Sequence, residues 1–129
     1  MSLRWYTLVV DCRDVKAQGR WWAEVLGWRV IREEDDEVVI VPPRRPDGTA
    51  VPREERGPAL VFVSVPEAKT VKNRLHIDLA ASPGGDLETE VRRLESAGAR
   101  RADIGQGDVD WVVMTDPEGN EFCVLSPPG

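Results

Sequence analysis

The chain has 129 residues, of which 41% are hydrophobic and 31% are charged, and its 17 basic and 23 acidic side chains give a formal net charge of −6. This acidic balance argues against nucleic acid or an anionic membrane surface as a partner, because such binding depends on clustered Lys and Arg. No run approaches the roughly 20 apolar residues that span a bilayer, and the pattern of a secretory signal is absent, so we expect one cytoplasmic domain with its own core.

The first half of the sequence predicts a strand, a helix and three further strands. Asp14 is a suitable N-cap for a helix over 15–26, and Gly27 follows where a helix commonly ends. Gly19 lowers the helix propensity by about 1 kcal/mol relative to Ala, so we expect packing to hold this helix. Alternating or β-branched runs predict strands at 5–11, 28–33, 37–41 and 59–65, and the prolines of 42–58 predict a loop.

The second half repeats the same order. Leu75, Ile77 and Leu79 alternate with polar residues and predict a strand over 74–79. A helix is expected over 86–97 with Gly98 after it, then strands at 100–104, 110–115 and 121–126. The segment 116–120 has the proline and glycine of a tight turn. The two cysteines, Cys12 and Cys123, lack the spacing of a disulfide framework or a structural zinc site, and we expect small buried side chains there.

The order strand, helix, strand, strand, strand therefore occurs twice, in units of about 3–65 and 73–126. We predict an α+β fold in which two tandem βαβββ units form a single domain over residues 1–129. A helix covers only one face of a four-stranded sheet, so the other faces predict a concave pocket between the two sheets.

Two sets of motifs carry a resemblance to a known family. They are Val9 to Asp14 with the helix ending Trp21 to Trp28, and Asn73 to Leu79 with the turn Asp116 to Phe122. With these motifs the chain resembles the vicinal oxygen chelate superfamily, which includes glyoxalase I, bleomycin-resistance proteins, fosfomycin-resistance enzymes and extradiol dioxygenases. The glyoxalase-like branch is the most similar, and the resemblance covers residues 3–125.

The resemblance implies where a divalent metal would bind. Metal-dependent members use His, Gln or Glu from the first and last strand of each unit, and the cation acts as a Lewis acid. The corresponding positions are Thr7, Val61 or Val63, His76 and Cys123, with Glu121 two residues before Cys123 on the same strand face. Threonine and valine cannot complete such a site, so we predict no complete metal site and no required cofactor, with His76 and Glu121 as the remaining candidate ligands.

The same positions define a candidate ligand pocket. His76 is the single histidine and the candidate catalytic residue, as a general base or hydrogen-bond partner, or it is a partly exposed polar residue. Asp78 shares its face and could orient the ring. Cys123 could be a thiolate nucleophile beside His76, although its apolar neighbours favour a buried thiol. Trp111 offers an aromatic wall or a core contact.

The predicted ligand pocket leaves the function open between two classes. The residues assigned to this pocket are Thr7, Val63, His76, Asp78, Trp111 and Cys123. One is a glyoxalase-like small-molecule-binding protein or enzyme without a full metal site, including a non-catalytic antibiotic binder of the bleomycin-resistance kind. The other is a metal-dependent lyase or dioxygenase. The family implies a small-molecule partner and a homodimer, with either intrachain or exchanged pairing of the units.

Overall fold

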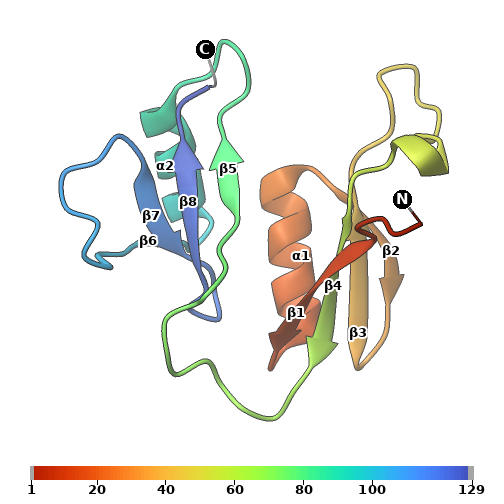
Figure 1. Cartoon of the computed structure of the whole chain (residues 1–129), viewed down its shortest axis with the longest axis horizontal. Helices are drawn as coiled ribbons and strands as arrows, with labels where there is room; N and C mark the ends of the chain where they lie inside the picture. The colour runs from red at the N-terminus through yellow and green to blue at the C-terminus, as the bar shows by residue number, and fades with distance from the viewer. Residues whose placement is uncertain (1, 128–129) are drawn as a thin grey trace. The chain divides into compact units, whose positions relative to one another are not determined.

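The computed structural model describes residues 2–127, and within them the chain forms two helices and eight strands (Figure 1). They divide into two compact units, one ending at Ala68 and the other beginning at Lys69. Each unit has the order strand, helix, strand, strand, strand, so the predicted α+β class and the tandem βαβββ pattern are confirmed. The elements of unit 1 are β1 (Thr7–Cys12), α1 (Val15–Leu26), β2 (Arg29–Glu33), β3 (Glu37–Val41) and β4 (Ala59–Ser64), and those of unit 2 are β5 (Asp78–Ala80), α2 (Leu87–Ser96), β6 (Arg100–Arg101), β7 (Val112–Thr115) and β8 (Glu121–Leu125).

Unit 1 is a four-stranded mixed sheet with a helix on one face. The strand order is β1-β4-β3-β2, with β1 parallel to β4 and the other neighbours antiparallel. Alternate residues of the central strands point toward α1 and are buried, because successive side chains of a strand point to opposite faces. These core residues are Val38, Ile40, Leu60 and Phe62, and Trp22 of α1 is buried with them.

Both ends of α1 follow the signals in the sequence. The Asp14 carboxylate accepts a hydrogen bond from the Ala17 backbone N–H at 3.1 Å, and Gly27 ends the helix with a φ of 67°. Gly19 lies on the buried side of the helix, where a Cβ would come within 2.5 Å of Val38 Cγ1. The glycine therefore allows α1 to approach the sheet closely, and this packing offsets the helix propensity that the glycine loses.

Unit 2 repeats this arrangement with the strand order β5-β8-β7-β6, in which β5 is parallel to β8. Its core lies between α2 and one face of the sheet and consists of Val91, Leu94, Met114, Phe122 and Val124, all of which are 2% exposed or less. The opposite face carries Cys123, which pairs with Asp78 on one side and with Val113 on the other. This second face is where the polar residues of the candidate site lie.

The strand predicted over 74–79 is wrong in its first part. Only Asp78–Ala80 forms β5, and Leu75, the first apolar residue of the predicted alternation, is 81% exposed. The cause is a long-range contact: the Asn73 backbone N–H donates to the carboxylate of Glu121 rather than to a neighbouring strand. The chain joins the sheet only at Ile77, whose carbonyl accepts a hydrogen bond from the Cys123 N–H. His76 therefore lies in the irregular segment just before β5.

The other predicted helices and strands are present, with small changes of boundary. The strand expected over 100–104 shortens to Arg100–Arg101, and the loop over 42–58 contains one helical turn, Arg53–Glu55. Cys12 and Cys123 are both buried and form no disulfide, as expected from their spacing. No helix in the described part of the chain has the length and apolar character needed to cross a membrane.

Candidate functional site

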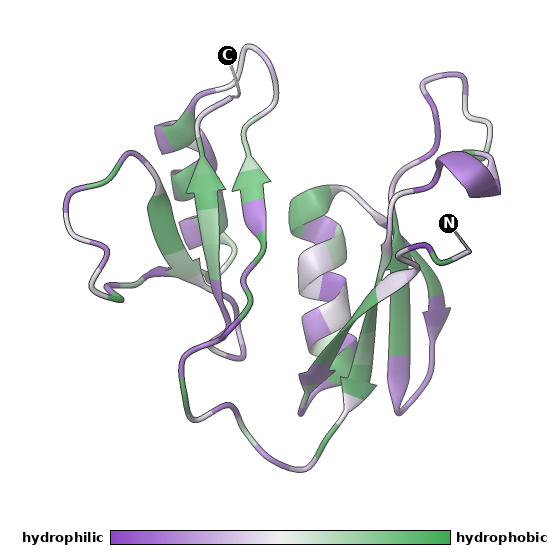
Figure 2. Ribbon diagram, in the orientation of Figure 1, coloured by the Kyte–Doolittle hydropathy of each residue, from purple (hydrophilic) through white to green (hydrophobic). Residues whose placement is uncertain are grey.

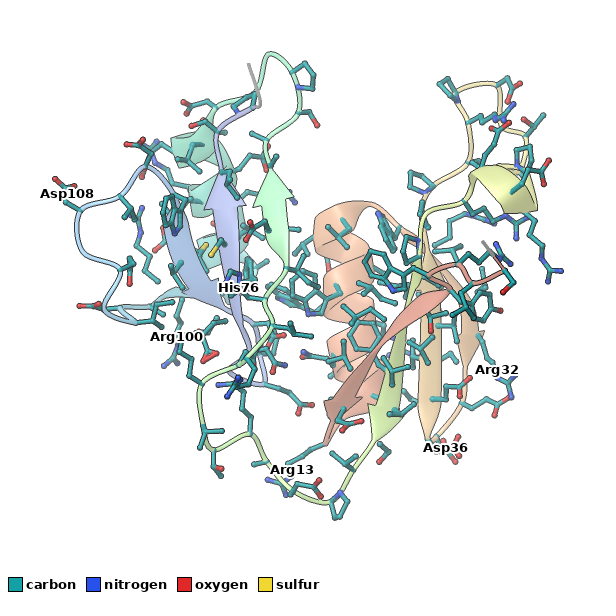
Figure 3. The ribbon with its side chains drawn as sticks, viewed as in Figure 1. Arg13, Arg32, Asp36, His76, Arg100 and Asp108 are labelled. Carbon is teal, nitrogen blue, oxygen red and sulfur yellow. The ribbon has the colours of Figure 1, made fainter. Side chains whose placement is uncertain are left out.

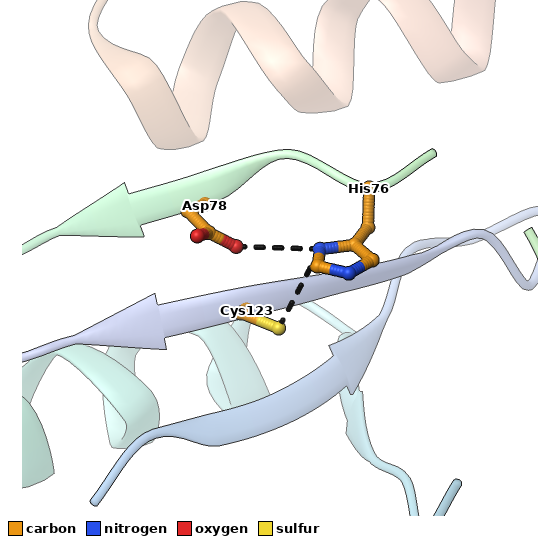
Figure 4. Close-up of side chains that lie close together, drawn as sticks. All are labelled: His76, Asp78 and Cys123. Carbon is orange, nitrogen blue, oxygen red and sulfur yellow. Dashed lines mark hydrogen bonds and ion pairs between the residues drawn. The ribbon is translucent and has the colours of Figure 1, made fainter. Parts of the chain in front are cut away.

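Three side chains that can ligate or transfer protons meet on the face of the unit 2 sheet opposite α2. They are His76, Asp78 and Cys123, and one ligand atom from each lies within 4.8 Å of the other two (Figure 4). The parallel pairing of β5 with β8 sets Asp78 directly beside Cys123, and His76 stands two residues before Asp78. Figure 3 shows the labelled His76 beside the strands of unit 2. Sheet register thus brings together residues that are 47 positions apart in sequence.

The imidazole of His76 lies between the other two groups. Its Nδ1 is 3.3 Å from Asp78 Oδ1 and 3.9 Å from Cys123 Sγ. An ionised carboxylate only accepts hydrogen bonds, so the contact with Asp78 favours a proton on Nδ1. In the Nδ1–H tautomer, Nε2 keeps its lone pair and can accept a proton or a hydrogen bond from a ligand. The His76 side chain is 41% exposed, so a ligand can reach it.

The thiol of Cys123, unlike the exposed ring of His76, is buried. Burial raises its pKa, and the nearby negative charge of Asp78 and a hydrogen bond to that carboxylate raise it further, against a smaller opposing effect from Lys72. The residue is only 5% exposed. At neutral pH Cys123 is therefore a protonated thiol, which is a weak nucleophile, because the thiolate is the reactive form.

Glu121, the other candidate ligand on β8, is engaged elsewhere. Its carboxylate accepts a hydrogen bond from Lys69 Nζ at 2.8 Å and two contacts from the Asn73 backbone N–H at 3.2 and 3.3 Å. The Asn73 side-chain amide donates to the Glu121 carbonyl. Burial acts to raise the pKa of Glu121, but the Lys69 and Asn73 contacts outweigh it and the pKa is lowered. Glu121 thus anchors the segment that leads to His76.

The sequence alone missed this anchor. Lys69 and Asn73 lie in a stretch without periodicity, and nothing in their spacing pointed to a residue about 50 positions later.

The other predicted pocket residues lie outside this cluster. Thr7 and Val63 lie on β1 and β4 of unit 1, whereas Trp111 immediately precedes β7 of unit 2 and is 41% exposed. Val113, two residues after Trp111, pairs with Cys123.

A family model described as a glyoxalase-like domain matches residues 7–125, which is nearly the whole chain. The chain belongs to the glyoxalase-like family. This confirms the resemblance to the vicinal oxygen chelate superfamily that the helix ending and the turn motif indicated. No curated protein matches the chain.

Solved structures share the fold of this glyoxalase-like chain at low sequence identity. A fosfomycin resistance protein, FosX, from Listeria monocytogenes is 10% identical with a TM-score of 0.68, and the match covers 99% of this chain and 94% of that one. A glyoxalase-related enzyme from Fulvimarina pelagi is 15% identical with a TM-score of 0.66, over 97% and 88% of the two chains. The oxidase ChaP-H2 is 20% identical with a TM-score of 0.63, over 99% and 96%. At these identities the likeness extends to the fold.

A variant of the Listeria FosX is solved in complex with Mn(II) and a dihydroxypropylphosphonic acid. The candidate ligand atoms of His76, Asp78 and Cys123 differ from the ligands that Mn(II) prefers. Mn(II) favours carboxylate, carbonyl and water oxygens, whereas the cluster here offers one imidazole nitrogen, one carboxylate and one sulfur. This mixed set suits a borderline or softer cation such as Zn²⁺ better than it suits Mn(II).

Proposed function

We propose that the chain binds a small organic molecule through the His76 cluster and needs no metal to do so. The observation that carries the proposal is the position of His76 Nδ1, within reach of both Asp78 and Cys123 on a face where the ring stays accessible. A carboxylate that holds one imidazole nitrogen leaves the other free to work as a base or an acceptor. The arrangement supports recognition of a ligand hydroxyl or removal of an acidic proton from it.

Each residue has a separate part in this proposal. His76 Nε2 accepts the proton of the ligand, Asp78 fixes the ring orientation and stabilises the imidazolium that results, and Cys123 packs below the ring as a neutral thiol. Trp111 supplies an apolar surface on the same face, suited to a planar or aliphatic part of the ligand. The single domain over 1–129 and the homodimer also belong to the proposal.

The single histidine makes the proposal directly testable. Protein with ¹⁵N-labelled histidine gives one imidazole signal pair by NMR, and these shifts report which nitrogen carries the proton. We expect the Nδ1–H form at high pH, and a shift of the Nε2 signal when a ligand binds. Fosfomycin, bleomycin and a set of small hydroxy ketones are suitable first probes.

The matched variants separate the site from the rest of unit 2. His76→Ala should abolish binding of any probe that shifts the imidazole signal, whereas Asp108→Asn, on an exposed loop of the same unit, should leave binding unchanged. A ligand that binds the His76→Ala variant as tightly as the wild type would contradict the proposal.

Light scattering of the purified protein tests the homodimer. A monomer at all protein concentrations would contradict the proposed homodimer.

A second candidate function is favoured by the closeness of the three ligand atoms. His76 Nδ1, Asp78 Oδ1 and Cys123 Sγ would hold a divalent cation such as Zn²⁺, with Cys123 losing its proton on binding. When bound, such a cation supplies Lewis-acid polarisation of a ligand oxygen, which is the chemistry of a lyase or dioxygenase of this superfamily.

Cobalt(II) distinguishes the two candidates, because a cobalt ion bound to a thiolate has a charge-transfer absorption in the near ultraviolet. The metal-free proposal predicts no such band on addition of one equivalent of Co²⁺. A band that disappears in Cys123→Ser would establish the metal-dependent function and overturn the metal-free one. Asp110→Asn, outside the cluster, is the matched control.

A further inference from the structure

The segment that carries His76 is attached to β8 of unit 2 at two points. At the first point, Asn73 donates from its backbone N–H to the Glu121 carboxylate and from its side-chain amide to the Glu121 carbonyl. At the second point, the Cys123 backbone N–H donates to the Ile77 carbonyl. His76 immediately precedes the second point, so its place above β8 depends on how the chain runs from one point to the other (Figure 4).

The chain between the two attachment points is longer than the distance that it covers. Two residues along a strand correspond to about 7 Å, whereas the four steps from Asn73 to Ile77 can extend to about 14 Å. The surplus length makes residues 73–77 an arch, with bends at Arg74 and Leu75. The Leu75 side chain is therefore exposed, and His76 lies where the arch returns to β8.

Little apolar burial holds this segment in place. Val71 and Leu75 are 74% and 81% exposed. Figure 2 shows the chain that leads into β5 as mostly hydrophilic, in contrast to most of β8. A segment with few buried apolar contacts opens locally at a low cost in free energy. The polar contacts at Glu121 therefore decide where the arch begins.

The Glu121 carboxylate is well suited to hold the first attachment point. It is nearly buried, and it accepts a hydrogen bond from Lys69 Nζ at 2.8 Å in addition to the contacts from Asn73. Hydrogen bonds to an ionised acceptor are stronger than those between neutral groups. Strand alternation also places Glu121 on the same face of β8 as Cys123, which lies beside the imidazole.

We propose that Glu121, together with Lys69 and Asn73, positions the His76 ring against Asp78. If the first attachment point is lost, the arch keeps only its end at Ile77, and the ring is free to leave the position where Nδ1 is 3.3 Å from Asp78 Oδ1. This inference rests on the proposed function, because it assigns the residues that keep the His76 base in the Nδ1–H form. Glu121 is a positioning residue and acts on the ligand through His76.

The tautomer of the single imidazole reports this positioning without any ligand. Glu121→Ala removes the acceptor of Lys69 and of the Asn73 N–H. We therefore expect the ¹⁵N imidazole signals at about pH 8 to change from the Nδ1–H pattern to the averaged tautomers of a histidine that is free in water. Glu121→Gln keeps an oxygen that can accept from Asn73, and it should restore much of the wild-type pattern. A probe that binds the wild type should bind Glu121→Ala at least about tenfold more weakly, with a smaller loss in Glu121→Gln.

Val91→Ala separates positioning from a general loss of stability. Val91 is buried on α2, against the face of the unit 2 sheet opposite His76. Its truncation destabilises the core without touching the arch, so the imidazole signals of the folded variant should match those of the wild type. Unchanged imidazole signals in Glu121→Ala, or an equal change in Val91→Ala, would contradict the positioning role.

Hydrogen exchange of the wild type tests the first attachment point even if Glu121→Ala does not fold. We expect the Asn73 amide to exchange at least about tenfold more slowly than the neighbouring Arg74 amide, although neither residue lies in a strand. Equal exchange would refute the attachment. The two proposals fail in different ways: a wild-type ring without the Nδ1–H form contradicts the proposed function and the positioning together, whereas unchanged signals in Glu121→Ala contradict the positioning alone.

Discussion

The ion pair between Lys69 and Glu121 is buried enough for its loss to be measured. Replacement of Lys69 by Met keeps the aliphatic stem but removes the ammonium group 2.8 Å from the Glu121 carboxylate. The side chains are 21% and 8% exposed, so neither group is well hydrated in the folded chain. Of the two donors described above, the Glu121 carboxylate would keep the Asn73 backbone N–H.

Breaking a buried ion pair by removing one partner typically costs about 3–5 kcal/mol. The Lys69 side chain is partly exposed and Glu121 retains its contact with Asn73, so we expect a smaller loss of stability, about 2–3 kcal/mol. For a chain of this size that corresponds to a fall of roughly 5–15 °C in Tm. Lys72→Met is the matched control, because Lys72 is an exposed lysine of the same segment and donates only to the Asn73 carbonyl.

The pH dependence provides an independent check of the same pair. The pKa of Glu121 is lowered by folding, so its contribution to stability is present at neutral pH and is lost as the pH falls through the lowered value. Urea unfolding of wild type and Lys69→Met should therefore differ fully at pH 7 and converge as the pH drops below 4.5, the ordinary value for glutamate. A Lys69→Met protein as stable as Lys72→Met, or a difference that does not change with pH, would refute the reasoning.

Two further substitutions test the packing of α1 and the state of the thiol. Gly19→Ala gains about 1 kcal/mol of helix propensity but places a Cβ 2.5 Å from Val38 Cγ1 and 2.9 Å from Val38 Cβ. Chemical denaturation should therefore show a net loss of about 1–2 kcal/mol, and the loss should be smaller when Gly19→Ala is made in a Val38→Ala background, which removes the nearer contact. A Gly19→Ala protein more stable than the wild type would contradict this. Asp78→Asn removes a charge that raises the pKa of Cys123, so iodoacetamide should modify Cys123 faster near pH 8, as measured by peptide mass mapping; an unchanged rate would show that burial alone controls the thiol.

The site was predictable only in part. His76 and Cys123 could be named in advance from their positions in the family motif, and Asp78 because it follows His76 by two residues, although His76 itself lies outside β5. Their protonation states could not be predicted from the sequence, because the raised pKa of Cys123 comes from burial and from the Asp78 carboxylate on the neighbouring strand. The role of Glu121 was also hidden, because a sequence does not show which loop residues return to a given carboxylate. The strand over 74–79 failed for the same reason, as the long-range contact at Asn73 overrides local alternation.

The sequence by itself determined the order of the secondary-structure elements in the two βαβββ units, the bounds of α1 between Asp14 and Gly27, and the family. These follow from periodicity, capping and turn residues, which act over a few positions. Only the tertiary structure decided why Gly19 is required, and which charged groups find partners. Lys69 reaches Glu121 while Arg29 reaches no acceptor in residues 2–127, and the composition of an acidic chain cannot distinguish the two. The pairing of charges depends on distances across the sheets, and those distances exist only once the chain has folded.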